Sequence, residues 1–469
     1  MDELGTNRPP GTRVEHVMQA VRARIASRSL NPGAKLPSIR ALATTMGVSK
    51  STIVEAYDRL AAEGVIRSRP GSGFFSAAAP PPLSLAELGP RLDRAVDPFW
   101  VSRQSLEAGP GMLKPGCGWL PAEWLPDEDI RRALRQLART RETAKLTDYG
   151  TPGGLAPLRQ LLSRRMAEQG FHAGPDQILL TESGTQAIDL VCRLLLQPGD
   201  AVLVDDPCYF NFLAVLRAHH AKIVGVPYTP EGPDLVAYET ALAEHRPRLY
   251  ITTSGLHNPT GATLRAATAH KVLKLAETHG ALIVEDDIFA DFEREPAPRL
   301  AALDGLDRVV RIGSFSKTLS ASFRCGYIAA RTDWIDRLVD LRIATGFASS
   351  PLSQDLVFSV LGSGTYRKYL DGLRVRLAKA RTDTLRRLRA LGIEPWLEPE
   401  AGMLLWCRLP DRLNAADVAR HALRGGVVLA PGNVFSPAQT AADFMRFNVA
   451  QCGDERVFRI LDGAMRSGL

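Results

Sequence analysis

Residues 311–330, RIGSFSKTLSASFRCGYIAA, decide the fold because they join a buried strand to a reactive side chain. The strand is expected over residues 309–312, and Lys317 follows it in a Ser-rich loop, three residues after Ser314 and seven before Arg324. An amine can form a Schiff base with an aldehyde, while hydroxyl and guanidinium groups can hold a phosphate. The segment therefore suits a phosphorylated aldehyde, although a lysine in such a loop is usually an ordinary solvated residue.

Two further segments carry groups that such a cofactor needs. In TESGTQAIDLV (181–191), the turn Ser183-Gly184-Thr185 opens a helix, where backbone N–H groups and the helix dipole favour a phosphate. In LIVEDDIFADF (282–292), a buried strand ends in Glu285, Asp286 and Asp287. A carboxylate at this place can keep a pyridine nitrogen protonated. A helix cap or a turn would explain the acidic residues equally well.

Three more segments complete the set. GLHNPTG (255–261) presents Asn258 in a loop, where its amide can bond to a ring oxygen. DDPCYF (205–210) offers Tyr209 as a flat surface for stacking. DFMRFNVA (443–450) places Arg446 on a strand, where its guanidinium can bind a carboxylate through two hydrogen bonds.

The same part of the chain has the pattern of an α/β fold. Short apolar runs recur between helical patterns, and they begin at Gln177, Ala201, Arg248, Ala281 and Arg308. Buried strands joined by helices predict a mainly parallel sheet.

Taken together and in order, these segments resemble the fold-type I aminotransferases, which depend on pyridoxal 5'-phosphate (PLP), from roughly Gly109 to the end of the chain. The resemblance implies that Lys317 forms the internal aldimine, Asp286 pairs with the pyridine nitrogen, Asn258 bonds to the ring oxygen and Tyr209 stacks on the ring. It implies that the phosphate is held by Ser183, Gly184, Thr185, Ser314 and Arg324, with Tyr149 of DYGTPGGL reaching in from a partner subunit. Arg446 would take an α-carboxylate.

One position departs from the pattern. Where a tyrosine commonly stands three residues after the pyridine-binding aspartate, this chain has Phe289, which cannot donate a hydrogen bond to the ring oxygen. Losing one donor to the ionised ring oxygen should raise the pKa of the aldimine, because that charged oxygen is less stabilised. Full transaminase chemistry is therefore in doubt.

The N-terminal residues predict three helices and a hairpin. Val14, Val17, Val21 and Ile25 form the apolar face of the first helix. Pro37 and Ser38 begin the second helix, whose Leu42 and Met46 face inward, and Gly47 ends it. Ser49 caps the third helix, whose buried stripe is expected at Val54, Tyr57 and Ala61. The segment VIRSRPGSGFF (65–75) then supplies a hairpin wing.

A helix, a Gly turn and a helix that exposes small polar and basic residues is the arrangement that binds the DNA major groove. A small helical packing domain would show the same periodicity. The segment LNPGAKLPSIRALATTMGVSKSTIVEAYDRLAAEGVIRSRPGSGFF (30–75) resembles the winged helix of the GntR superfamily of bacterial regulators over its whole length. By that resemblance, the candidate DNA-binding residues are Arg40, Ser49, Lys50, Ser51, Thr52 and Tyr57 on or beside the helices, and Arg67, Arg69 and Gly71 in the wing.

Composition and charge agree with two different domains. Of the net charge of +7, residues 1–80 carry +5, because they hold eleven Lys and Arg against six Asp and Glu. We predict a winged helix at 10–76, an Ala- and Pro-rich linker at 77–108 that Pro80, Pro81 and Pro82 extend, and a PLP-binding effector domain at 109–469. A basic module beside a nearly neutral domain is typical of a DNA-binding unit joined to an effector domain.

Several other classes of protein are not expected. The six cysteines are scattered without a Cys-x-x-Cys pair, so neither a metal site nor a disulfide framework is predicted. No apolar run approaches the thickness of a bilayer, and the N-terminus lacks the apolar core of a signal peptide. We therefore expect a cytoplasmic protein with no membrane partner.

A GntR winged helix joined to an aminotransferase-type domain resembles the MocR-type regulators, which sense small molecules through bound PLP. The resemblance implies a homodimer that binds a double-stranded DNA operator and senses PLP, an amino compound, or both, through an external aldimine at Lys317. A working aminotransferase with a passive winged helix is the alternative. A third possibility is a domain that has lost PLP and serves only for dimerisation.

Overall fold

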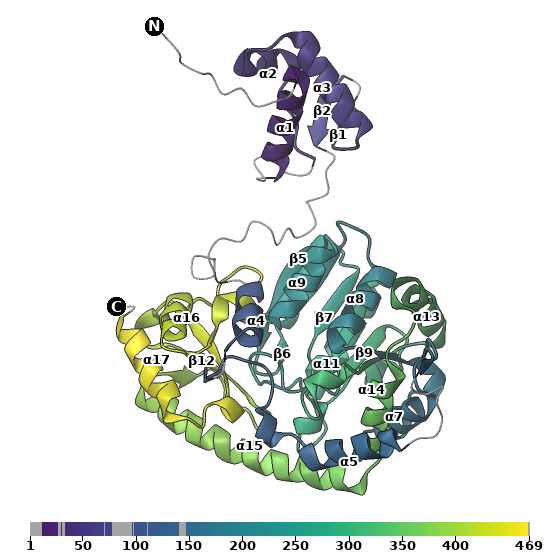
Figure 1. Cartoon of the computed structure of the whole chain (residues 1–469), viewed down its shortest axis with the longest axis vertical. Coiled ribbons are helices and arrows are strands. Elements are labelled where there is room, and N and C mark those ends of the chain that lie inside the picture. Colours follow the sequence, from purple (N-terminus) through teal and green to yellow (C-terminus); the bar gives the residue numbers. More distant parts are fainter. Residues whose placement is uncertain are drawn as a thin grey trace. The chain divides into compact units, whose positions relative to one another are not determined.

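A computed structural model of the chain describes residues 12–26, 30, 33–69, 71–76, 96, 98–109, 111–139 and 147–467. The proline run 80–82 of the predicted linker lies outside these residues. By their contacts the residues form two compact units, Met1–Leu88 and Gly89–Leu469 (Figure 1). Within the described part of the chain, no helix is both long and apolar enough to cross a membrane.

The N-terminal unit has the predicted three helices and wing. Their bounds are α1 (Arg13–Ala26), α2 (Ile39–Met46), α3 (Lys50–Ala62), β1 (Ile66–Arg69) and β2 (Gly73–Ser76). Ser38 caps α2 by accepting a hydrogen bond from the Ala41 N–H at 3.2 Å, and Ser49 caps α3 through the Thr52 N–H at 3.2 Å. Gly47 ends α2 with a φ of 63°, a left-handed conformation that glycine adopts without strain. The caps predicted from the sequence are therefore confirmed.

The buried face of α3 differs from the prediction by one residue. Ile53, Ala56, Tyr57 and Leu60 are buried, whereas Val54 is 40% exposed. The spacing 53, 56, 57 and 60 gives a fuller apolar stripe than 54, 57 and 61, because it places four side chains on one helical face. The prediction for Val54 was wrong, and Tyr57 belongs to both patterns.

The larger unit is built on an eight-stranded sheet. Its strand order is β3-β10-β9-β8-β7-β4-β5-β6, in which β4, β5, β7, β8 and β9 run parallel while β3, β10 and β6 pair antiparallel with their neighbours. The strands are β3 (Ile178–Thr181), β4 (Ala201–Asp206), β5 (Lys222–Thr229), β6 (Gly232–Pro233), β7 (Leu249–Thr252), β8 (Leu282–Asp286), β9 (Val309–Ser314) and β10 (Gly326–Ala329). The mainly parallel α/β sheet expected from the apolar runs is confirmed.

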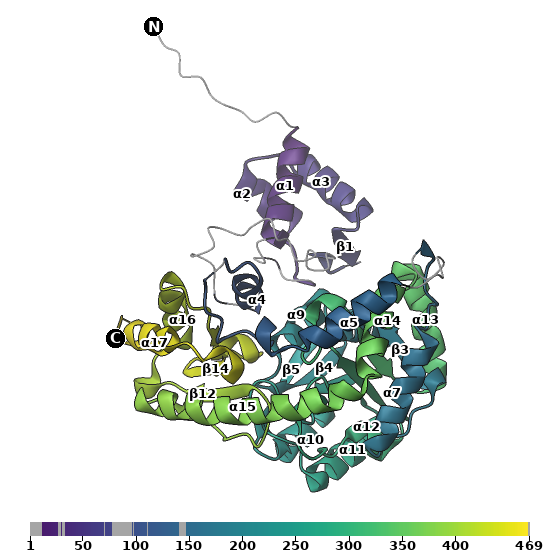
Figure 2. The same ribbon diagram turned by 60° about the horizontal axis from the view of Figure 1, so that its bottom comes forward.

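Helices cover both faces of this sheet (Figures 1 and 2). Val202 and Val204 of β4 pack with one layer, while Leu203 between them packs with the other. Alternate residues of a strand point to opposite faces, so a continuous apolar run fills both layers. The first layer contains α8 (Gly184–Leu195), α9 (Phe210–Ala218) and α13 (Thr332–Gly346), and the second contains α7 (Ala156–Glu168), α10 (Leu235–His245), α11 (Ala266–His279), α12 (Leu300–Asp304) and α14 (Pro351–Leu361).

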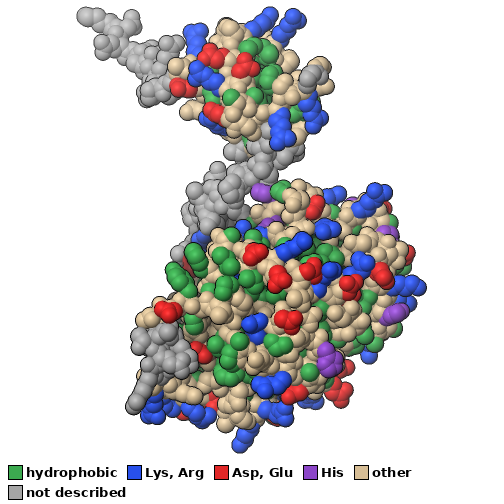
Figure 3. Space-filling view, turned by 90° about the vertical axis from the view of Figure 1, so that its right-hand side faces the viewer, with side chains coloured by type: hydrophobic (Ala, Val, Ile, Leu, Met, Phe, Trp, Pro, Cys, Tyr) green, Lys and Arg blue, Asp and Glu red, His purple; other side chains and the backbone are tan. Residues whose placement is uncertain are grey.

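A smaller antiparallel sheet forms near the C-terminus, in the order β11-β12-β14-β13. Its strands are β11 (Glu394–Pro395), β12 (Leu404–Arg408), β13 (Ala430–Pro431) and β14 (Phe444–Asn448). The remaining helices are α4 (Pro98–Leu106), α5 (Asp127–Ala138), α15 (Gly364–Ala390), α16 (Ala415–Arg424) and α17 (Glu455–Ser467). Arg446 lies on β14, as predicted. Figure 3 shows acidic and basic side chains interspersed over one face of the larger unit.

The range 77–108 that the sequence assigned to a linker contains α4. Trp100 and Val101 of this helix are almost fully buried, and α4 packs against α9. The Val96 carbonyl accepts a hydrogen bond of 2.8 Å from the Asn433 side chain, which joins this segment to the C-terminal part of the unit. The end of the predicted linker is thus an integral part of the larger unit.

The corrected face of α3 predicts different costs for two adjacent truncations. Ile53→Ala removes a fully buried side chain and should lower the free energy of unfolding by about 2 to 5 kcal/mol. Val54→Ala, on the exposed side, should change it by less than about 0.5 kcal/mol. Urea unfolding of the two variants measures this difference, and similar losses in both would contradict the assigned face.

Candidate functional site

A cavity of about 390 Å³ lies where the parallel strands of the larger unit end. Asp286 ends β8, and Tyr209, Asn258 and Lys317 follow β4, β7 and β9. Ligand sites of open α/β sheets form at this edge, because the loops after the strands converge there. The predicted residues that line the cavity are Ser183, Gly184, Thr185, Tyr209, Asn258, Asp286, Lys317, Arg324 and Arg446.

Lys317 and Asp286 have strongly shifted acidities. Burial, together with the nearby Arg446 cation, lowers the pKa of Lys317 to about 8. Burial raises the pKa of Asp286 to about 7, against a hydrogen bond of 3.1 Å from the Ile288 N–H that lowers it. Desolvation disfavours the charged form of each group, so the cavity presents an amine that is partly neutral near pH 8.

Arg446 is fixed beside Lys317 by two hydrogen bonds. Its guanidinium donates to the Asn258 side-chain oxygen at 3.0 Å and to the Gly116 carbonyl at 2.6 Å. A methyl group on Gly118 would lie 3.7 Å from Arg446 Nη2 and 3.8 Å from Lys317 Nζ, so both cations face the same backbone. Because the Asn258 oxygen is occupied, its NH₂ group is the part left to donate to a ligand.

The start of α8 forms a compact cradle. Ser183 caps the helix by accepting from the Gln186 N–H at 3.0 Å, and the backbone of residues 183–184 touches Gly326 of β10. A Cβ on Gly326 would lie 2.8 Å from the Ser183 carbonyl carbon and 3.0 Å from the Gly184 nitrogen, closer than side chains tolerate. Glycine is therefore required at this position, so that β10 can support the cradle.

Two predicted residues do not line the cavity. The Ser314 hydroxyl lies behind Gly184 and bonds to the Cys325 carbonyl at 3.2 Å, while its neighbour Ser316 lines the cavity instead. Tyr149 is 83% exposed and stacks on Phe347, with ring centroids 5.5 Å apart. Phe289 lines the cavity and is buried, so no hydroxyl is present at that place.

Two segments of the lining were not predicted from the sequence. Cys117, Gly118 and Trp119 approach from one side, and α4 contributes Phe99, Ser102, Ser105 and Leu106. Neither segment contains a motif, because its role comes from contacts with residues more than a hundred positions away. In the sequence, only the helical spacing of the α4 residues could have indicated that they form an element of the fold.

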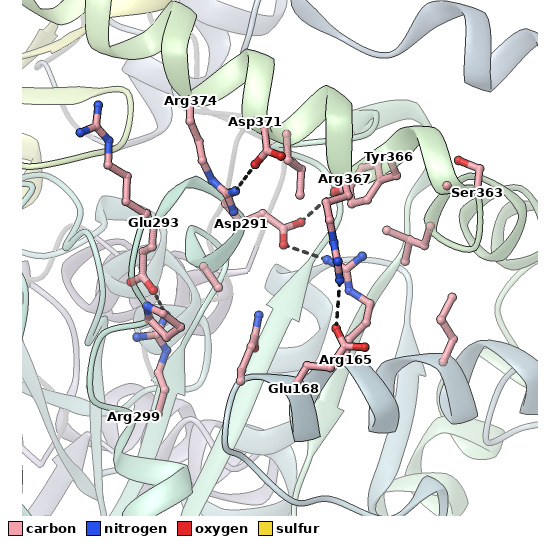
Figure 4. A pocket seen from close by; sticks show the side chains of 18 residues that line it. Arg165, Glu168, Asp291, Glu293, Arg299, Ser363, Tyr366, Arg367, Asp371 and Arg374 are labelled. Carbon is pink, nitrogen blue, oxygen red and sulfur yellow. Dashed lines mark hydrogen bonds and ion pairs between the residues drawn. The ribbon is translucent and has the colours of Figure 1, made fainter.

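A larger cavity, of about 560 Å³, lies beside α7 and α15 and does not include Lys317 (Figure 4). Most of its charged side chains are paired with one another. Arg165 pairs with Asp291 at 3.0 Å, Arg299 with Glu293 at 2.7 Å and Arg374 with Asp371 at 2.9 Å. These ion pairs account for the charged residues of the larger cavity, and no ligand is needed to explain them. The smaller cavity, which contains Lys317, is therefore the candidate site.

Asp291 in that wall connects to the Lys317 loop. Its carboxylate accepts hydrogen bonds from Tyr366 at 2.8 Å and from Thr318 at 3.3 Å, and Thr318 is the residue after Lys317. Asp291 thus positions the loop without touching the cavity that holds Lys317.

The N-terminal unit presents the predicted DNA-binding residues with one exception. Arg40, Lys50 and Arg67 are exposed and make no ion pair among the described residues, and Arg69 lies over the Phe75 ring at 4.6 Å. Ser49 and Thr52 join the cap of α3, Ser51 is exposed beside them, and Gly71 lies in the wing turn. Tyr57 is fully buried, and its hydroxyl donates to the Pro37 carbonyl at 2.9 Å. This position corrects its assignment as a DNA contact, because the side chain is committed to the core.

Comparison with known proteins agrees with both units. Residues 121–463 match the family Aminotransferase class I and II, and residues 13–75 match the gntR family of bacterial regulatory proteins. The chain is 32% identical to the uncharacterized HTH-type transcriptional regulator YdcR of Escherichia coli, over 94% of this chain and 96% of that protein. It is 28% identical to the HTH-type transcriptional regulator NorG of Staphylococcus aureus, over 79% and 86% of the two chains. Among solved structures, the α-aminoadipate aminotransferase LysN of Thermus thermophilus superposes with a TM-score of 0.72 at 26% identity, over 81% of this chain and 96% of LysN.

The fold and the cavity therefore define a class I and II aminotransferase domain, and the chain belongs to that family. With the GntR winged helix ahead of this domain, the whole chain is a GntR-type transcription regulator with the layout of the MocR subfamily.

The position of Arg446 predicts the titration of Lys317 in cofactor-free protein. Only a neutral amine reacts with an acylating reagent, so the labelling rate of Lys317 should rise with pH through a pKa of about 8. Arg446→Gln should raise that pKa, because one cation beside the amine is lost. Arg324→Gln is the control, since Arg324 lines the cavity without being among the charges that shift Lys317. Peptide mass spectrometry measures the rates, and equal shifts in both variants would rule out the assigned interaction.

Proposed function

We propose that this protein is a DNA-binding regulator whose larger unit holds PLP at Lys317 and senses PLP, an amino compound, or both. One observation carries the proposal: a half-buried amine, a buried carboxylate and a buried guanidinium converge in one cavity of a chain that also has a winged helix. An amine that is partly neutral near pH 8 can attach to a carbonyl carbon. The buried Asp286 carboxylate would be stabilised by a cationic ring.

The donor set fits PLP. When bound, PLP supplies an aldehyde carbon to which amines attach, together with visible absorbance. Asp286 would hold the proton of the ring nitrogen, the Asn258 NH₂ group would donate to the ring oxygen, and Tyr209 would lie against the ring. The α8 cradle and Arg324, which has no ion pair among the described residues, would hold the phosphate. LysN, with the same fold, was solved with N-(5'-phosphopyridoxyl)-L-leucine.

An amino compound would enter beside Lys317 and place its carboxylate on Arg446. The Arg446 Nε has no hydrogen-bond partner among the described residues, so the guanidinium retains donor capacity. Burial lowers the pKa of Arg446 to about 10, and an anionic ligand would raise it again by stabilising the cation. Regulation then requires that the ligand bind two states of the protein with different affinity.

We also propose a homodimer that binds paired half-sites of an operator. Tyr149 and Phe347 form an exposed aromatic pair, and Ile343 beside them is 41% exposed. Such a surface is suited to a second copy of the chain, from which Tyr149 would approach the partner's cavity.

A working aminotransferase remains the second candidate, because the cavity holds every charged residue that the reaction needs. Phe289 weighs against it, since the site lacks a hydroxyl donor at that place. Steady-state turnover of amino donors at rates of about 1 per second or more would favour the enzyme, whereas slow single turnovers would favour the regulator.

The proposal that the larger unit holds PLP at Lys317 predicts the behaviour of the Lys317→Ala variant. The wild-type protein with PLP should show a visible absorption band, and Lys317→Ala should lose that band and the response of DNA binding to PLP. Mobility shifts with DNA from upstream of the protein's own gene measure the response. An unchanged band in the variant, or an absence of specific DNA binding with and without PLP, would contradict the proposal.

The proposal that the winged helix binds DNA predicts that substitutions near the two ends of α3 have unequal effects on operator binding. Lys50→Ala removes an exposed cation from the first turn and should weaken operator binding at least about fivefold. Arg59→Ala, which removes a cation paired with Glu55 at 2.6 Å near the other end of the helix, should have little effect. Fluorescence anisotropy at fixed salt compares the two, and a reversed order would place the DNA elsewhere.

A further inference from the structure

Helix α4 brings an unsatisfied hydroxyl to the cavity. Ser105 is 3% exposed, and its Oγ has no hydrogen-bond partner among the described residues. It lines the cavity together with Phe99, Ser102 and Leu106 of the same helix. A buried hydroxyl without a hydrogen-bond partner is unfavourable. A ligand that bonds to this hydroxyl therefore gains more free energy than a ligand that has to replace an existing hydrogen bond.

The charged groups of the cavity already have other roles. Among the described residues that line the cavity, Asp286, Lys317, Arg324 and Arg446 are the only Asp, Glu, Lys or Arg residues, and the proposed function assigns each to the cofactor or to an α-carboxylate. Arg103, the nearest basic residue on α4, lies outside the lining and faces Glu107 at 3.8 Å.

The rest of the lining is apolar or uncharged. Phe99, Leu106 and Ile188 lie in it with Ser102 and Ser105. Beside the buried Ser105, an ionised ligand side chain would lose hydration without gaining a counter-ion from the described lining residues, which is unfavourable. An uncharged side chain with an apolar stem and a hydrogen-bonding end would lose little and could satisfy Ser105.

We infer that Ser105 of α4 contacts the side chain of the effector, and that the effector is an amino acid with an uncharged, hydrogen-bonding side chain. The inference rests on the proposed function, because it takes PLP at Lys317 and a carboxylate on Arg446 as given.

The position of α4 connects binding of the effector with regulation of DNA binding. The helix begins at Pro98, directly after the segment that leads from the winged helix, and Trp100 and Val101 anchor it in the larger unit. A ligand that bonds to Ser105 therefore stabilises the docked α4, the first helix described after the winged helix along the chain.

Titration of the PLP-bound full-length protein with isosteric amino acids tests the inference, with the change in its visible absorption as the readout. Glutamine and glutamate have the same shape and differ in charge, as do norleucine and ornithine. Glutamine should bind at least about tenfold more tightly than glutamate, and norleucine more tightly than ornithine. Equal or tighter binding of the charged member of both pairs would overturn the inference.

The Ser105→Ala variant isolates the hydroxyl. It should weaken glutamine binding by roughly threefold to tenfold and leave norleucine binding unchanged. Gln104→Ala, on α4 but outside the lining, is the matched control and should change neither. Since the Ser105 hydroxyl has no partner to lose, the variant should keep the unfolding midpoint of the wild type, which separates a local effect from misfolding.

The outcomes separate this inference from the proposed function. A visible band that depends on Lys317 but responds to no amino acid would overturn the inference and leave PLP binding intact. A Ser105→Ala variant that binds glutamine like the wild type would also overturn it. Absence of the band itself would overturn the proposed function, and the inference with it.

Discussion

The cavity depends on one constraint, the burial of opposite charges that are not paired with each other. Asp286 gains a proton more easily than a free carboxyl, and Lys317 and Arg446 lose theirs more easily, in each case chiefly because the groups are shielded from water. Such an arrangement costs free energy unless a ligand completes it. A cationic ring opposite Asp286 and a carboxylate on Arg446 would complete it. The shifted acidities are therefore expected of a site built for a ligand with charges at both places.

The three consecutive acidic residues at the end of β8 show how the scaffold holds this site. Asp286 enters the cavity, whereas Glu285 accepts hydrogen bonds from the backbone of Leu300 and Ala301 and so caps α12. Asp287 accepts from Arg299 at 2.6 Å in a buried ion pair. The neighbours of the functional carboxylate are thus structural. They fix the end of β8 from the side away from the cavity, so that Asp286 needs no ion pair to hold its place.

Much of this arrangement could be predicted from the sequence, because it depends on local patterns. The strands, the caps at Ser38 and Ser49, and the loop that carries Lys317 each follow from short-range periodicity or from turn residues. The exposed Val54 shows the limit of that reasoning, since Ile53 and Val54 are apolar residues at adjacent helical positions and leave the buried face ambiguous. Residues 116–119 and α4 could not be predicted as parts of the cavity. They reach it only through the tertiary fold, and the composition around residues 77–108 favours a linker.

The place of α4 bears on how a ligand in this domain can influence DNA binding. Along the chain, the winged helix leads into the larger unit through the segment that ends at α4, so a signal can pass along it. The buried side chains of Trp100 and Val101 anchor that helix in the larger unit. The Ser105 hydroxyl lacks a hydrogen-bond partner among the described residues, so one polar group of the docked helix is left unsatisfied. A ligand that bonds to Ser105 changes the free energy of a helix that both lines the cavity and follows the connection along the chain. Coupling of this kind needs no rearrangement of the eight-stranded sheet, whose strand β8 ends at Asp286 in the cavity.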